Sequence, residues 1–164
     1  MQRRQLLIGT LLIPALPAFA KTLSDSIQTD LGSSRLIYLT PLKSDGTEST
    51  CQGEVWYVYH NNAIYVNTQM EAWRANAIKK GLTGARIWVG DVGMWKRAEG
   101  AYKDLPRLHG TGSVVSDSAE WESVYPAFGE KYSDEWPTWG PRFKNGLEDG
   151  SRILLKYSDL SAES

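Results

Sequence analysis

Residues 54–67, with the sequence EVWYVYHNNAIYVN, decide the fold of this chain. β-Branched and aromatic residues dominate both halves of the stretch, which predicts strands over residues 54–59 and 63–67. The HNN triplet between them predicts a tight turn, because asparagine tolerates the left-handed backbone conformation that two-residue hairpin turns require. We therefore expect an antiparallel β-hairpin in the middle of the chain.

Further strands are expected on both sides of this hairpin. Five segments have the composition of strands: residues 35–40, 85–90, 93–98, 108–116 and 151–157. Short turns join most of them, and strands and helices do not alternate regularly along the chain. This pattern favours an antiparallel sheet or a small barrel over a doubly wound fold.

Two segments have the composition of helices. Residues 71–80 begin with an acidic residue, end with two lysines and are followed by Gly81, a common helix stop. A capping box at residues 117–120 predicts the start of a second helix. We expect Pro126 to kink or shorten that helix, since proline removes a backbone donor. The segment 133–150, rich in tryptophan, proline and glycine, is expected to form a loop.

The first twenty residues have the features of an export signal. Two arginines precede an apolar stretch over residues 6–16, and Ala18-Phe19-Ala20 matches a small-x-small cleavage site. The apolar stretch is shorter than the roughly 20 residues that span a bilayer. An amphipathic first helix is the alternative, but residues 6–16 offer no polar face.

The residues RRQLL at positions 3–7 resemble the twin-arginine export motif, although paired arginines also occur in ordinary secretory signals. We expect cleavage after Ala20 and a periplasmic mature protein with no stable membrane insertion. Residues 21–34 would then form an arm or short helix, and residues 35–164 one domain.

Composition limits the possible functions of the 164-residue chain. Its formal net charge of -1 argues against nucleic-acid binding, which needs an excess of basic residues. Cys51 is the single cysteine, so an intrachain disulfide is impossible, and its thiol is more simply explained as structural than as nucleophilic. Two histidines and one cysteine, without zinc-type spacing, favour no metal site.

One segment has the residues for binding an anion. Asn67 and Thr68 end a predicted strand, and Arg74 lies in the first turn of the predicted helix that follows. Hydroxyl, amide and guanidinium donors grouped in this way suit a phosphate group. The alternative is an ordinary helix start with Arg74 directed into solvent.

The order of these elements resembles the FMN-binding split β-barrel family, the pyridoxamine 5′-phosphate oxidase-like proteins. The resemblance rests on the hairpin, on the basic helix followed by RIWV, and on LHGTGSVVSD at residues 108–117 with a helix ending FGEKY. It covers about residues 35–157 and consists of many weak matches. It implies a mainly β (α+β) fold, an antiparallel split barrel with two or three helices, and a homodimer that holds FMN at its interface.

The resemblance also assigns candidate cofactor-binding residues: Val55, Trp56, Asn67, Thr68, Trp73 and Arg74. The strand-end pair would hold the flavin phosphate, and the first two residues would lie under the ring. The triplet at residues 72–74 is Ala-Trp-Arg where the family has Ser-Arg-Lys, so one hydroxyl and one cation are missing. Lys79 or the partner chain could supply a further charge.

The function implied is that of an exported FMN-binding oxidoreductase acting on an unknown small molecule. No catalytic side chain is named, because the flavin carries the electrons. Two alternatives stay open. One is a non-catalytic barrel that binds haem or another small ligand, and the other is an interaction protein. Trp136 and Trp139 could wall a pocket or an interface, or could pack as a lid.

Overall fold

The computed structural model describes residues 23–163. The expected signal peptide, with its cleavage site after Ala20, lies outside the described residues and stays a prediction. Helix α1 (Asp25–Ser33) occupies most of the expected arm, and the hydroxyl of Ser24 caps it by accepting the N–H of Ile27. No helix within residues 23–163 is both long enough and apolar enough to cross a membrane.

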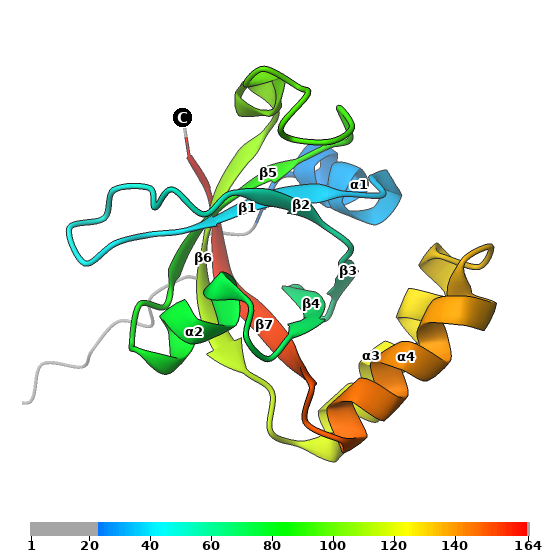
Figure 1. Cartoon of the computed structure of the whole chain (residues 1–164). Coiled ribbons are helices and arrows are strands. Elements are labelled where there is room, and N and C mark those ends of the chain that lie inside the picture. The colour runs from blue at the N-terminus through cyan, green and yellow to red at the C-terminus, as the bar shows by residue number, and fades with distance from the viewer. Residues whose placement is uncertain (1–22, 164) are drawn as a thin grey trace, which may run out of the picture.

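A single antiparallel sheet forms the body of the molecule, with the strand order β2-β1-β5-β6-β7-β4-β3. The strands are β1 (Ile37–Pro41), β2 (Gly53–Val55), β3 (Val58–His60), β4 (Ala63–Gln69), β5 (Gly84–Val89), β6 (Arg107–Val114) and β7 (Arg152–Glu163). The edge strands β2 and β3 follow each other in the chain, with two residues between them. One continuous segment therefore pairs with both ends of the sheet, which curls into a barrel (Figure 1).

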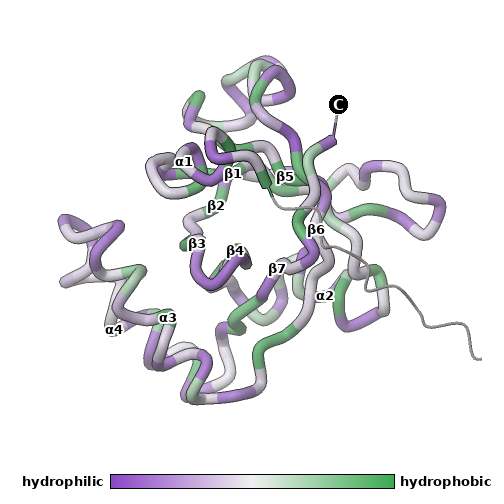
Figure 2. The backbone as a smooth tube through the Cα atoms, turned by 180° about the vertical axis from the view of Figure 1, so that it is seen from behind, coloured by the Kyte–Doolittle hydropathy of each residue, from purple (hydrophilic) through white to green (hydrophobic). Residues whose placement is uncertain are grey.

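The expected hairpin is confirmed, with one difference. β3 and β4 pair antiparallel with Val58 opposite Tyr65, and Asn61 and Asn62 have φ angles of 48° and 59°. Figure 2 shows the turn between them as strongly hydrophilic. The expected strand over residues 54–59 is divided at Trp56 and Tyr57, because its first half pairs with β1 and its second half with β4.

Tyr132 satisfies the backbone at this division. The N–H of Tyr57 donates to the Tyr132 hydroxyl oxygen at 2.8 Å. That hydroxyl lies 2.9 Å from the carbonyl oxygens of both Tyr57 and Arg35, and its proton can go to either. Since the sheet is interrupted here, a fully buried side chain replaces the missing ladder partner.

The remaining helices are α2 (Trp73–Lys79), η1 (Ala101–Asp104), α3 (Ser118–Lys131) and α4 (Trp136–Glu148). α3 and α4 form a helical hairpin outside the barrel, on the side of β3, β4 and β7 (Figure 1). One core fills the barrel, and a second, rich in aromatic residues, lies between the barrel and this hairpin. The mainly antiparallel, α+β fold class is confirmed.

Two local expectations were wrong, and one of the two effects expected of Pro126 is absent. Residues 93–98 form turns and no strand, and residues 133–150 contain α4 where a loop was expected. Pro126 does not shorten α3, which continues to Lys131. Pro126 and Pro141 are both exposed, so water can reach the carbonyl groups that lose a helical partner. Pro137 lies in the first turn of α4, where no backbone donor is required.

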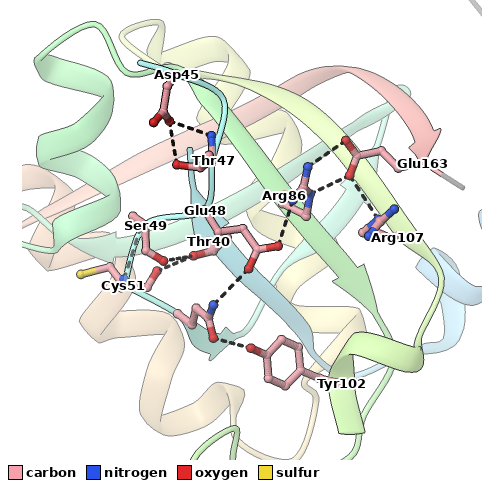
Figure 3. Close-up of polar contacts among 11 residues, drawn as sticks. Thr40, Asp45, Thr47, Glu48, Ser49, Cys51, Arg86, Tyr102, Arg107 and Glu163 are labelled. Atoms are coloured by element: carbon pink, nitrogen blue, oxygen red, sulfur yellow. Dashed lines mark hydrogen bonds and ion pairs between the residues drawn. The ribbon is translucent and has the colours of Figure 1, made fainter. Parts of the chain in front are cut away.

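An ion-pair network joins the end of β7 to the rest of the barrel (Figure 3). Arg86 on β5 pairs with Glu163 at 2.7 Å and with Glu48 of the β1–β2 loop at 2.9 Å. Glu163 also pairs with Arg107 on β6. The hydrogen bonds that Arg86 donates to Glu163 and Glu48 raise the pKa of Arg86. The network therefore links three strands and a loop on the far side of the barrel from α4.

Candidate functional site

A pocket of about 470 Å³ opens where the end of β4 meets the start of β7, beneath α4. Its lining consists of Val55, Trp56, Val66, Asn67, Thr68, Gln69, Ala72, Arg74, Trp139, Phe143 and Arg152. Five of the six candidate residues from the sequence are among them. The sixth, Trp73, is 46% exposed and is not part of the lining.

Arg74 reaches the pocket from the second residue of α2. Its Nη1 donates to the Thr68 hydroxyl at 2.8 Å, and the other terminal nitrogen lies over Gly53, where a side chain would begin 3.6 Å away. Burial lowers the pKa of Arg74, and the electrostatic effects of Tyr157, Cys51 and Glu54 partly oppose this shift. Among residues 23–163, no carboxylate forms an ion pair with this guanidinium.

Arg152 supplies a second guanidinium from the first residue of β7. It faces Gln69 in the β4–β7 register, its Nε donates to the Asn67 side-chain oxygen, and its Nη2 donates to the Asn67 carbonyl at 3.3 Å. The guanidinium also lies 4.7 Å from the centre of the Phe143 ring. Burial lowers the pKa of Arg152, and it too has no carboxylate partner within the described part of the chain.

Asn67 is 6% exposed, and its side chain is oriented by Arg152. A guanidinium only donates hydrogen bonds, so the Asn67 oxygen must face it and the amide nitrogen must face away. That nitrogen, Nδ2, is buried and has no acceptor among residues 23–163. Leaving a buried donor unsatisfied costs about 1–3 kcal/mol, which an acceptor atom of a bound molecule would recover.

Aromatic rings from two parts of the chain form the other wall. Trp56 comes from the division between β2 and β3, and Trp139 and Phe143 come from α4. The centres of the Trp56 and Trp139 rings are 5.7 Å apart. Trp56 is also stacked on Tyr132, at 4.4 Å with 6° between the planes, so its ring orientation is fixed from behind.

The lining suits a planar anion. One end presents two guanidinium groups and the amide nitrogen of Asn67, and the other end presents aromatic rings. No histidine, cysteine, carboxylate, lysine or tyrosine is present among the described residues that line the pocket, so it offers no ordinary general acid or base. Redox or group-transfer chemistry here would have to be supplied by a bound cofactor.

Several expectations about this region need adjusting. α2 begins at Trp73 and has seven residues, against the expected ten over residues 71–80, and its first residues have no side-chain cap. The donors identified in the pocket are the side chains of Arg74, Arg152 and Asn67. Lys79 donates to the Met70 carbonyl and lies outside the lining. Arg152 and Phe143 had no signal in the sequence, because 85 residues separate Arg152 from Asn67.

No protein-family model and no curated protein sequence matches the chain. Similar solved structures do exist. HutZ, the heme storage protein from Vibrio cholerae, is 16% identical with a TM-score of 0.57, covering 85% of this chain and 89% of its own. A putative pyridoxamine 5′-phosphate oxidase from Listeria innocua is 13% identical with a TM-score of 0.50, covering 85% and 93%. An F420 reductase is 13% identical with a TM-score of 0.50, covering 87% and 97%.

The chain has the split β-barrel fold of these proteins. The resemblance to pyridoxamine 5′-phosphate oxidase-like proteins, expected from the sequence, is thus confirmed at the level of the fold. At 13–16% identity the similarity establishes architecture. The occupant of the pocket has to be argued from the residues that line it.

Proposed function

We propose that the chain is an exported oxidoreductase that binds FMN in the pocket beneath α4 and acts on a small molecule. The proposal rests on a pair of guanidinium groups, Arg74 and Arg152, which face one pocket and have no carboxylate partner in the described part of the chain. A flavin phosphate carries a charge near −2, which two such groups balance. Binding it would also offset the desolvation that lowers the pKa of both arginines.

The second guanidinium accounts for the charge that residues 72–74 lack. The sequence provides one cation there, Arg74, and the structure adds Arg152 from the other end of the chain. Thr68, whose oxygen accepts from Arg74, can donate its own proton, and the free Nδ2 of Asn67 can donate as well. Four side chains would therefore hold the phosphate group.

The aromatic wall would hold the ring system of the cofactor, with Trp56 and Trp139 as its contacts. The pocket volume of about 470 Å³ lies within the range of about 300–1,000 Å³ that small-molecule sites occupy. When bound, FMN supplies the electron transfer. The chain's own part is to position the cofactor and to exclude water from one side of it.

Homodimer formation, export to the periplasm and a small-molecule substrate belong to the same proposal. The first is supported by the family resemblance, and the second by residues 1–20.

A haem occupant is less well supported, because the usual axial ligands, histidine, cysteine, methionine and tyrosine, do not occur among the described residues of the lining.

The test is a titration of the mature protein, from residue 21, with FMN and with riboflavin, followed by flavin fluorescence. We expect FMN to bind more tightly than riboflavin, because only FMN carries the phosphate. Arg74→Ala and Arg152→Ala should each weaken FMN binding about 10- to 100-fold, the loss typical of a charged hydrogen bond. Arg97→Ala, on an exposed turn, is the matched control.

Two results would contradict the proposal. Equal affinity for FMN and riboflavin would show that the two arginines do not bind the phosphate group. If the protein fails to bind flavin but shows a strong Soret band with haem, its cofactor is haem and not FMN.

A further inference from the structure

Aromatic side chains form a continuous series from the pocket to a groove beside the α3–α4 hairpin. Its members are Trp56, Trp139, Phe143, Trp136, Tyr125 and Trp121. The first three line the pocket. The last two line a separate surface groove of about 520 Å³ between α3 and the end of α4. The series thus connects two separate cavities.

The rings in this series are close neighbours throughout. Trp139 lies 5.7 Å from Trp56 and 6.0 Å from Phe143, measured between ring centres. Trp136 lies 5.7 Å from Phe143 and 4.9 Å from Tyr125. Tyr125 in turn lies 4.9 Å from Trp121.

The ring of Trp136, the middle member, packs tightly against two glycines, Gly129 and Gly140. A Cβ atom on Gly129 would lie 2.8 Å from its indole nitrogen, and one on Gly140 would lie 2.9 Å from its ring. Gly129 is on α3 and Gly140 is on α4, so the indole ring is clamped between the two helices. The two glycines make room for a ring of this size, and it has little freedom to move.

Indole and phenol groups are the side chains most easily oxidised by one electron. Four tryptophan and tyrosine residues, Trp139, Trp136, Tyr125 and Trp121, are separated by at most one phenyl ring, that of Phe143. Tyr132, stacked on Trp56, offers a poorer branch. Its hydroxyl faces backbone carbonyls, which cannot accept the proton that an oxidised tyrosine releases.

We infer that this aromatic series carries single electrons from the surface groove to the pocket, and so discharges strong one-electron oxidants that form there. Trp139 loses an electron to the oxidant and becomes a radical cation. Trp136 then reduces Trp139 across Phe143, and Tyr125 reduces Trp136. Tyr125, which is half-buried at the groove, releases its proton to water and becomes a neutral radical. The oxidant gains one electron, and water gains one proton.

The choice of oxidant rests on the proposed function, in which light-excited flavin is an oxidant of this class. The route itself can be tested without flavin. Gln69 is exposed and lines the pocket, so Gln69→Cys in a Cys51→Ser background allows one ruthenium polypyridine complex to be attached there. A light flash with a soluble electron acceptor then produces ruthenium(III) at the pocket.

Electron paramagnetic resonance and mass spectrometric mapping of oxidised residues follow the result. We expect a tyrosyl radical after the flash, with stable oxidation products at Tyr125. Trp136→Phe should abolish both and confine oxidation to Trp56 and Trp139. Tyr125→Phe, which keeps the ring, should remove the tyrosyl signal and leave a tryptophan radical. Trp88→Phe changes a tryptophan in another buried cluster and should behave as the parent.

An unchanged yield of oxidised Tyr125 in Trp136→Phe, with the fold verified by circular dichroism, would overturn the inference. The same illumination of the FMN-loaded protein separates the two proposals. If FMN does not bind while the ruthenium-labelled protein oxidises Tyr125, the proposed cofactor is wrong and the electron route stands. If FMN binds but neither oxidant reaches Tyr125, the route is wrong and the cofactor assignment stands.

Discussion

The role of Asn67 in the pocket depends on the arginines beside it, Arg152 and Arg74. Arg152 holds its oxygen, and this leaves Nδ2 as a buried donor at the positive end of the pocket. Arg74 and Thr68 complete a group in which charge and hydrogen-bond donors both favour an anion. The protein therefore carries an unsatisfied donor and two desolvated cations in one place, and a ligand with acceptor oxygens would relieve all three.

A carboxylate at position 67 should compete with such a ligand. In Asn67→Asp the new side chain pairs with Arg152, so we expect FMN affinity to fall at least about tenfold while riboflavin affinity changes little. Parallel titrations with the two flavins measure this difference. Asn145→Asp, an exposed change on α4 with the same charge, is the control. Equal losses for both flavins would contradict an electrostatic role for this corner of the pocket.

The Tyr132 hydroxyl offers a second test at the residue scale. Tyr132→Phe keeps the ring stacked on Trp56 but leaves the Tyr57 N–H without its partner. We expect the free energy of unfolding to fall by about 1–3 kcal/mol, the cost of a buried unsatisfied donor. Urea denaturation measures it. Tyr59→Phe, which removes an exposed hydroxyl, should change stability by less than about 0.5 kcal/mol.

At the scale of elements, α4 decides the shape of the pocket. Trp139 and Phe143, one turn apart on this helix, form the aromatic wall, and Gly146 follows on the buried side. A Cβ atom on Gly146 would lie 2.4 Å from Arg152 Cγ and 2.5 Å from Cδ. The helix therefore rests directly on the stem of Arg152. The position of that guanidinium depends on the docking of α4.

This contact predicts that Gly146→Ala disturbs the pocket, although alanine is the better helix former. Alanine favours a helix over glycine by about 1 kcal/mol, yet here it should push the Arg152 side chain aside and weaken FMN binding. Gly32→Ala in α1, where nothing lies within 4 Å, should instead stabilise the protein and leave FMN binding unchanged. Thermal unfolding and FMN titration of both variants test the pair. Undiminished FMN affinity in Gly146→Ala would show that Arg152 does not hold the phosphate.

At the scale of the whole molecule, Lys131 joins three parts of the structure. It ends α3, donates to the Leu31 carbonyl of α1 at 3.3 Å, and lies 3.6 Å above the Tyr57 ring at the barrel division. Burial lowers the pKa of Lys131 to about 8. The charged form is therefore disfavoured by folding, relative to the unfolded chain with its ordinary pKa.

The sign of the resulting pH dependence follows from proton binding. Between the folded pKa of about 8 and the ordinary lysine value of 10.5, the unfolded chain holds more protons at this residue, so stability should rise with pH. In Lys131→Met this rise should disappear. Chemical denaturation from pH 7.5 to 9.5, below the range where unfolded tyrosines ionise, measures the difference between the two proteins. Parallel curves would show that the lysine titrates normally.

The sequence by itself determined the features that depend on neighbouring residues. The β3–β4 hairpin follows from asparagines that accept positive φ, and the start of α3 from Asp117, whose carboxylate caps Ala119. Half of the pocket also depends on residues that are neighbours in the sequence. Asn67, Thr68 and Arg74 lie within eight residues, so a strand end followed by a short helix brings their side chains together wherever the chain folds this way.

Only the tertiary structure decided the other half. Arg152 meets Asn67 because β7 pairs with β4, and this pairing joins residues 85 apart whose register no local pattern specifies. The proline- and glycine-rich segment of α4 resembled a loop because its stability comes from packing against the barrel and α3. Propensity reports what a segment prefers alone, whereas the second cation and the aromatic wall exist only through contacts made after the barrel has closed.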